Sequence, residues 1–140
     1  MFWIACDNGW NGGDFTGTLP GGVTWRDNYD NYNDIVNETH PLLEGFPFER
    51  SLEGNYASHG GFDNLNIADI QNLVVFIKEN STYEKYPTYI EYRYGNGRVI
   101  ASTSPLEFYV ENSYSDSDWY ILLLRRSIEY VFNLPISPVE

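Results

Sequence analysis

The 140-residue sequence is poor in cysteine, in basic residues and in long apolar runs. A single cysteine, Cys6, excludes an internal disulfide framework and leaves the redox compartment open. Only 8 basic residues stand against 20 acidic ones, and the net charge of -12 repels phosphate backbones, so we expect no nucleic-acid partner. No run approaches the length of a membrane-spanning helix, so we expect no membrane insertion. The opening MFWIACDNGW turns polar too soon for a signal peptide, and the location, cytoplasmic or extracellular, stays open.

Apolar and aromatic residues are plentiful, at 42% and 17% of the chain, which indicates a globular protein. A chain of this length can bury one core, and no repeat or linker divides it. We therefore expect a single domain over residues 1–140.

The segment YIEYRYGNGRVIASTSPLEFY predicts a β-hairpin near the centre of the fold. Residues 89–94 alternate in the manner of a strand, and residues 95–97, GNG, tolerate the positive φ of a tight turn. Residues 98–104 are apolar enough for a return strand buried on both faces, and Pro105 ends it. Glu107 then lies just past the end of a core strand, where sites gather in open α/β sheets.

Three further elements follow from local patterns. Residues 2–6 and 73–77 predict short buried strands. An apolar stripe predicts a helix that starts near Asp116, which offers a cap and favourable charge, and stops before Pro135.

The segment DNYDNYND concentrates acidic and amide side chains. Asp27, Asp30 and Asp34 are candidate calcium ligands, because calcium prefers oxygen donors at short spacing. The spacing does not match an EF-hand loop, which favours a solvated acidic turn as the alternative. We expect no other cofactor.

The glycine-rich loop over residues 7–22 follows the first predicted strand. Asp7, Asn8 and Trp10 in this loop are candidate ligand-binding residues, together with His59 and Glu107. A long surface loop is the alternative interpretation. The many aromatic residues could offer a platform for a small polar or carbohydrate ligand, although large aromatics also dominate protein cores.

Four short runs resemble the class I glutamine amidotransferase-like superfamily: His40-Pro41-Leu42 with Gly45, NYASHG over residues 55–60, YGNGRVI over residues 94–100, and Pro105-Leu106-Glu107. The resemblance implies an α/β fold, a partial flavodoxin-like three-layer sandwich whose mixed sheet carries a C-terminal β-hairpin and a C-terminal helix. Active members of the superfamily end the corresponding strand in His-Pro-Glu, whereas this chain has Ser104-Pro105-Leu106-Glu107. The nucleophile elbow Gly-x-Cys-x-Gly is likewise replaced by IACDNG.

This resemblance makes Cys6 a candidate nucleophile, His59 its base and Glu107 the residue that orients the base. The alternatives are a small core cysteine and a structural histidine. Because the motifs depart from the active pattern, we expect a non-catalytic, amidotransferase-like binding or assembly module. The alternative is a Cys- or carboxylate-dependent hydrolase that acts on an amide or glycosidic bond.

A flavodoxin-like domain has two βα units before the strand that residues 2–6 resemble, and these units are missing from the sequence. The remaining sheet would expose an apolar edge and a face without helices. We therefore expect a homo-oligomer, most simply a symmetric dimer, or a longer parent protein.

Overall fold

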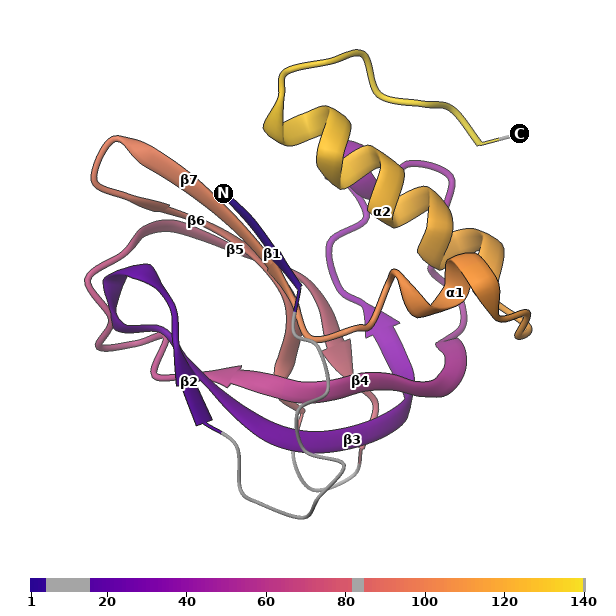
Figure 1. Cartoon of the computed structure of the whole chain (residues 1–140), viewed down its shortest axis with the longest axis horizontal. Helices are drawn as coiled ribbons and strands as arrows, with labels where there is room; N and C mark the ends of the chain where they lie inside the picture. The colour runs from indigo at the N-terminus through magenta and orange to yellow at the C-terminus, as the bar shows by residue number, and fades with distance from the viewer. Residues whose placement is uncertain (5–15, 82–84, 140) are drawn as a thin grey trace.

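The computed structural model describes residues 1–4, 16–81 and 85–139, which form one curled sheet with a helical layer beside it (Figure 1). The strands are β1 (Phe2–Ile4), β2 (Thr16–Thr18), β3 (Thr24–Ile35), β4 (Leu52–Asp63), β5 (Gln71–Glu79), β6 (Pro87–Tyr94) and β7 (Gly97–Ser102). The helical segments are η1 (Pro20–Gly22), η2 (Pro41–Leu43), α1 (Phe108–Glu111) and α2 (Ser117–Val131). Among these described helices, none has both the length and the apolar content that a membrane crossing requires.

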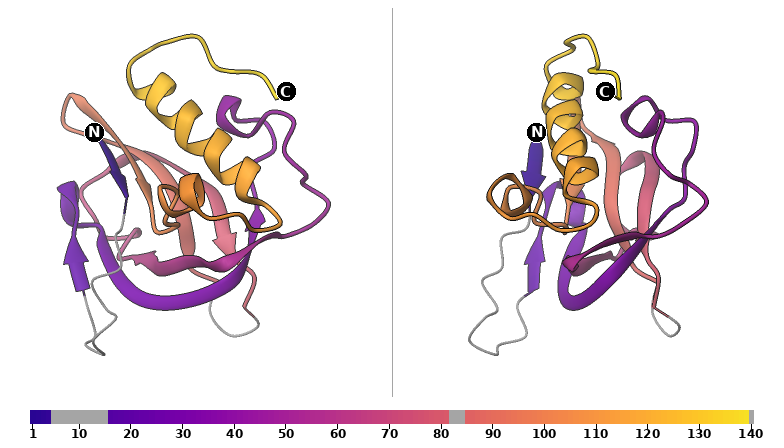
Figure 2. Two further views of the ribbon diagram at one scale, coloured as in Figure 1. Left: turned by 45° about the vertical axis from the view of Figure 1, so that its right-hand side comes forward. Right: turned by 90° about the vertical axis from the view of Figure 1, so that its right-hand side faces the viewer.

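The sheet has the strand order β1-β7-β6-β5-β3-β2, with β4 paired to β3 outside this path. All pairs are antiparallel except β1 with β7. The long strand β3 pairs with β2 at its start, with β4 from Thr24 to Asn33 and with β5 at its end, and the sheet curls into a half-barrel around it (Figures 1 and 2). The His59 N–H donates to the Thr103 carbonyl at 2.9 Å, which joins β4 to the segment after β7.

Strand β6 lies in the middle of the molecule and is buried on both faces. Tyr89 points toward α2, whereas Ile90 and Tyr92 point into the curl. The core under the helices contains Ile35, Leu42, Leu43, Phe46, Leu52, Phe76, Ile77, Tyr89, Ile100, Leu106, Tyr109, Tyr120 and Leu123. The core inside the curl contains Leu19, Val23, Trp25, Phe62, Ile90, Tyr92, Val99 and Ala101. Alternate residues of one strand therefore serve two cores.

The predicted hairpin is confirmed. Tyr94 pairs with Gly97 across a two-residue turn, in which Gly95 takes a φ of 56° that favours glycine. The return strand β7 is buried on both faces, as expected from its apolar run. The first strand, β1, is the parallel neighbour of β7, with Phe2 opposite Ile100 and Ile4 opposite Ser102.

The predicted C-terminal helix is confirmed as α2, which packs over the sheet. Arg126 on this helix is only 2% exposed, and its guanidinium donates to the carbonyls of Leu42 at 3.1 Å and Glu44 at 2.8 Å. Its Nε donates to the Ser137 carbonyl at 2.8 Å. A buried arginine thus fixes the η2 loop and the C-terminal segment to α2, because its charge is compensated by backbone acceptors.

The predicted flavodoxin-like sandwich is wrong. That fold needs parallel strands joined by crossover helices on both faces of the sheet. Here the strands are mostly antiparallel, and the described helices α1 and α2 lie on one side of the half-barrel. The other face of β6 is covered by the curled sheet. The apolar face that we expected to be exposed is therefore buried within the chain, and the expected oligomer no longer has this structural reason.

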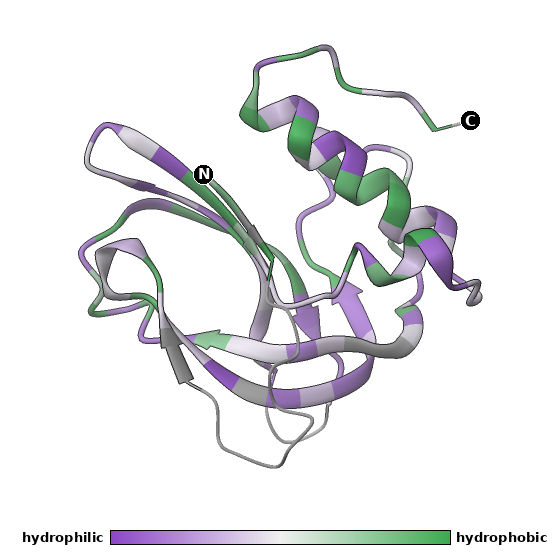
Figure 3. Ribbon diagram, in the orientation of Figure 1, coloured by the Kyte–Doolittle hydropathy of each residue, from purple (hydrophilic) through white to green (hydrophobic). Residues whose placement is uncertain are grey.

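The predicted acidic turn over residues 27–34 is also wrong, because these residues lie within β3. Strand β3 carries mostly hydrophilic residues (Figure 3), and its buried positions include a polar one. Asn33 is fully buried, and its side chain donates to Ser58 Oγ at 3.2 Å and accepts from Thr88 Oγ1 at 2.6 Å. Such a polar interior hides the apolar alternation that would have indicated a strand.

Candidate functional site

The structure places only part of the predicted catalytic site. Cys6, Asp7, Asn8 and Trp10 lie outside the described residues. His59 lies in β4, with its ring 5.7 Å from that of Tyr29. Glu107 directly precedes α1, past the end of β7 as predicted, and is exposed. The proposed triad therefore stays a prediction, although the bond between His59 and Thr103 brings β4 to the chain segment that leads to Glu107.

The predicted calcium ligands lie in β3, and the two whose side chains are described have different partners. Asp34 accepts from Asn80 Nδ2 at 2.9 and 3.0 Å and from Ser51 Oγ at 2.5 Å. Asp30 Oδ1 accepts from the Tyr32 N–H at 3.0 Å. Of Asp27 only the backbone is described, and among the described residues no group of three or more metal-binding side chains forms. Calcium binding stays a prediction, which a calcium titration followed by the melting temperature tests.

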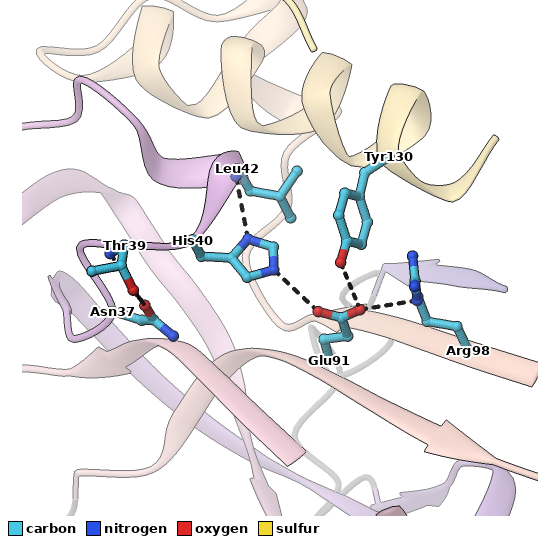
Figure 4. A network of polar contacts seen from close by, with 7 residues as sticks. All are labelled: Asn37, Thr39, His40, Leu42, Glu91, Arg98 and Tyr130. Atoms are coloured by element: carbon cyan, nitrogen blue, oxygen red, sulfur yellow. Dashed lines mark hydrogen bonds and ion pairs between the residues drawn. The ribbon is translucent and has the colours of Figure 1, made fainter. Parts of the chain in front are cut away.

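A cluster of four polar side chains, the Glu91 cluster, joins the sheet to the helical layer (Figure 4). Glu91 projects from β6, and its Oε2 lies 3.1 Å from His40 Nε2. Its Oε1 lies 3.0 Å from both Tyr130 Oη and Arg98 Nε. Both carboxylate oxygens are therefore occupied by partners from the η2 entry, β7 and α2.

The second ring nitrogen of His40 fixes how the histidine takes part. The Leu42 N–H donates to His40 Nδ1 at 3.2 Å, which assigns the proton of the neutral ring to Nε2 and directs it at Glu91. The His40 ring packs against Phe76 at 4.3 Å and Tyr130 at 5.3 Å between centroids. The Arg98 guanidinium lies 4.7 Å from the centre of the Tyr130 ring. The partners of Glu91 thus also hold one another.

The environment of Glu91 favours its charged form. Burial by itself would raise the pKa of Glu91, but the hydrogen bonds from His40 and Tyr130 and the charge of Arg98 together lower it below its usual value. A carboxylate that stays ionised and has both oxygens bonded acts as a fixed junction. Such a carboxylate has little hydrogen-bonding capacity left for a substrate.

A second polar region lies at the opposite end of α2. It is a cavity of about 240 Å³, which we call the tyrosine hollow, lined by Asn31, Tyr32, Glu53, Gly54, Tyr114 and Ser115. The lining comes from β3, from β4 and from the turn between α1 and α2. Tyr32 and Glu53 are paired across the two strands, and register shifts next to Asp30 disturb the ladder here. Bulges of this kind re-aim side chains and occur often beside sites.

The floor of the tyrosine hollow is fixed by Asp116, which is only 2% exposed. Its carboxylate accepts two hydrogen bonds from Arg50, at 2.8 and 2.9 Å, and one from the Glu53 N–H at 2.6 Å. Burial would raise the pKa of Asp116, but these bonds and the arginine charge lower it. Ser117 Oγ accepts from the Tyr114 N–H at 2.7 Å, so the turn that carries Tyr114 is held in place.

Aromatic rings support Tyr114 from behind. Its ring lies against Phe108 at 5.8 Å and meets the edge of Tyr109 at 6.1 Å. Tyr109 in turn stacks on Tyr120, with centroids 4.4 Å apart and planes 14° from parallel. The wall of the hollow is therefore backed by a packed tyrosine stack.

This stack contains buried polar atoms without partners. The hydroxyls of Tyr109 and Tyr120 and the Oδ2 atom of Asp30 have no hydrogen-bond partner in the part of the chain that the structure describes. Both tyrosines are 1% exposed. Burial raises the pKa of Tyr120, and the nearby Tyr109, Asp116 and Asp30 raise it further. A buried polar group without a partner costs about 1–3 kcal/mol, so such a group calls for an explanation.

Comparison with known proteins adds one relative. No protein-family model matches the chain, and no solved structure matches it. The chain is 32% identical over 113 residues, or 81% of its length, to an uncharacterised protein of Clostridium acetobutylicum. The matched segment makes up 11% of that protein, so the chain spans only a small part of its length.

Sequence reasoning named His40 and Asp116 for other reasons and missed the other residues of both polar regions. Glu91 counted only as one residue of the alternating pattern over residues 89–94. Its place on the same strand face as the apolar Tyr89 was a signal that its charge is buried and bonded. Tyr32, Glu53 and Tyr114 come from distant segments, and no local motif connects them.

Proposed function

We propose that this chain is a non-catalytic binding module and that it holds its ligand in the tyrosine hollow. The observation that carries the proposal is the hollow itself, which presents the exposed side chains of Tyr32, Glu53 and Tyr114 from firmly held segments. A rigid, concave site with aromatic and polar side chains is what a small polar ligand needs. Asp116 and the tyrosine stack supply the rigidity.

The relative supports the view of this chain as a module. A unit similar to 81% of the chain occupies 11% of a much longer protein. We infer that the domain acts as one part of a longer protein, and that it works there by binding. A homo-oligomer remains the alternative, although the exposed sheet face that suggested it is covered.

Two features of the chain lead us to propose that it is not catalytic. The Glu91 carboxylate has both oxygens bonded, and its charged form is stabilised, so it is a poor proton acceptor. Residues 104–107, SPLE, lack the histidine of the active amidotransferase pattern. The resemblance to that superfamily stays a prediction, and the fold it implied is wrong.

Two assays test the proposal. Incubation with glutamine and with 4-nitrophenyl glycosides should release no more ammonia or nitrophenol than buffer does. Release that is lost in Cys6→Ala or in Glu107→Gln would establish the alternative, a hydrolase.

Binding is tested by saturation-transfer NMR with a mixture of methyl glycosides, N-acetyl amino-acid amides and dipeptides. We expect at least one compound to bind and to lose its signal in Tyr114→Ala. The matched control is Tyr94→Ala, which removes a similarly exposed tyrosine at the β6–β7 turn. If no compound binds, or if Tyr114→Ala binds as well as the control, the hollow is not the binding site.

A further inference from the structure

We propose that the ligand of the tyrosine hollow is a neutral sugar, recognised as a single pyranose ring. This inference rests on the proposed function, because it names the ligand class of the same site. It is carried by the combination of exposed tyrosine rings, a carboxylate and an amide around a small, fixed cavity.

The aromatic part of the hollow suits the apolar face of a sugar. Tyr32 is 46% exposed and Tyr114 is 42% exposed. The Phe108 and Tyr109 rings support the Tyr114 ring, and the Tyr32 hydroxyl lies 3.4 Å from Glu53 Oε1. A pyranose ring presents C–H groups on one face, and the negative face of an aromatic ring attracts them. Rings that are fixed before binding lose little entropy when they stack on a ligand.

The polar part of the hollow suits hydroxyl groups. The Glu53 side chain is exposed, and its Oε1 accepts a long hydrogen bond of 3.4 Å from Tyr32 Oη, so the carboxylate can also accept from ligand hydroxyls. The Asn31 amide contains both a donor and an acceptor. Neighbouring sugar hydroxyls, each a donor and an acceptor, match this pair of side chains.

Charge and size narrow the ligand further. The chain has a net charge of -12, and Glu53 in the lining with Asp116 beneath it repels anionic ligands. The volume of about 240 Å³ lies below the roughly 300–1,000 Å³ of sites for drug-sized ligands. The hollow therefore accepts one ring, such as the terminal residue of a glycan, and excludes a bound stretch of several rings.

The test is a titration by saturation-transfer NMR and calorimetry with the methyl glycosides of glucose, galactose, mannose, xylose and N-acetylglucosamine. We expect at least one to bind saturably. Tyr114→Ala should weaken that binding about tenfold or more, and Glu53→Gln should weaken it by a smaller factor. Tyr114→Phe keeps the ring and should keep most of the affinity, and Tyr94→Ala should leave it unchanged.

Three results would overturn the inference. The first is that none of the five glycosides binds. The second is that a glycoside binds equally well to Tyr114→Ala and Tyr94→Ala. The third is that methyl glucuronide, which carries a negative charge, binds as tightly as methyl glucoside. If an amide or dipeptide binds in the hollow and no glycoside does, the binding module stands and the sugar assignment falls.

Discussion

The Glu91 cluster and the tyrosine hollow use similar side chains at the two ends of α2, with opposite results. Each contains a carboxylate with a lowered pKa, an arginine bonded to it and at least one tyrosine. In the Glu91 cluster the Tyr130 hydroxyl donates to the carboxylate, and both oxygens are occupied. Behind Tyr114 in the wall of the hollow, the Tyr109 and Tyr120 hydroxyls are buried without partners among the described residues.

This difference separates a structural junction from a binding site. A saturated polar cluster gains nothing from a ligand, because a ligand would have to replace bonds that already exist. The hollow, by contrast, presents exposed side chains of Tyr32, Glu53 and Tyr114 that a ligand can contact without replacing the bonds of a saturated cluster. Similar composition therefore does not imply similar function.

The largest expected effect comes from removing the centre of the saturated cluster. Glu91→Ala leaves His40, Arg98 and Tyr130 without their shared acceptor in a buried setting. We expect the free energy of unfolding in urea to fall by about 3–5 kcal/mol. Glu111→Ala, at the exposed end of α1, should stay within about 0.5 kcal/mol of the parent. A loss below about 1 kcal/mol in Glu91→Ala would show that the cluster is not a junction.

A pair of single-hydroxyl deletions contrasts the two regions directly. Tyr130→Phe removes a hydrogen bond to a charged group and should cost about 1.5–3 kcal/mol of unfolding free energy. Tyr120→Phe removes a buried hydroxyl that has no partner among the described residues, and it should be neutral or stabilise by up to about 1 kcal/mol. Equal losses in the two variants would contradict this contrast between the two regions.

The smallest expected effect is on the pH dependence of stability. The pKa of Glu91 is lower in the folded protein than its ordinary value of 4.5, so the folded state binds this proton more weakly than the unfolded chain. The stabilisation from Glu91 is therefore present above about pH 4.5 and is lost as the pH falls through the folded pKa. Glu91→Gln should flatten the acid limb of stability against pH below about pH 4.5. An unchanged slope would contradict the account of this carboxylate.

The sequence predicted elements that local patterns define. The glycine turn between Tyr94 and Gly97, the apolar run of β7 and the stripe of α2 each carry their signal within a few residues. The strands β3 and β4 carry no such signal. The middle of their shared interior is polar, with Asn33 bonded to Ser58, so the apolar residues near the ends of these strands form no local alternation.

Neighbouring glycines in β4 show the same limit. A Cβ atom on Gly60 would overlap the Trp25 indole, and one on Gly61 would overlap Tyr86. These glycines therefore make room for packed aromatic side chains inside a strand. Tertiary packing, which no local pattern encodes, decides both this strand and the residues that meet in the hollow.

The most direct test of the difference between the Glu91 cluster and the tyrosine hollow is to locate the bound ligand residue by residue. We would record ¹H–¹⁵N correlation spectra while titrating the protein with the methyl glycoside that binds best. The account predicts shifts of the amide signals at Asn31, Glu53 and Tyr114, with the signals of Glu91 and Arg98 unmoved. Shifts centred on Glu91 and Arg98, or no shifts in either region, would contradict it.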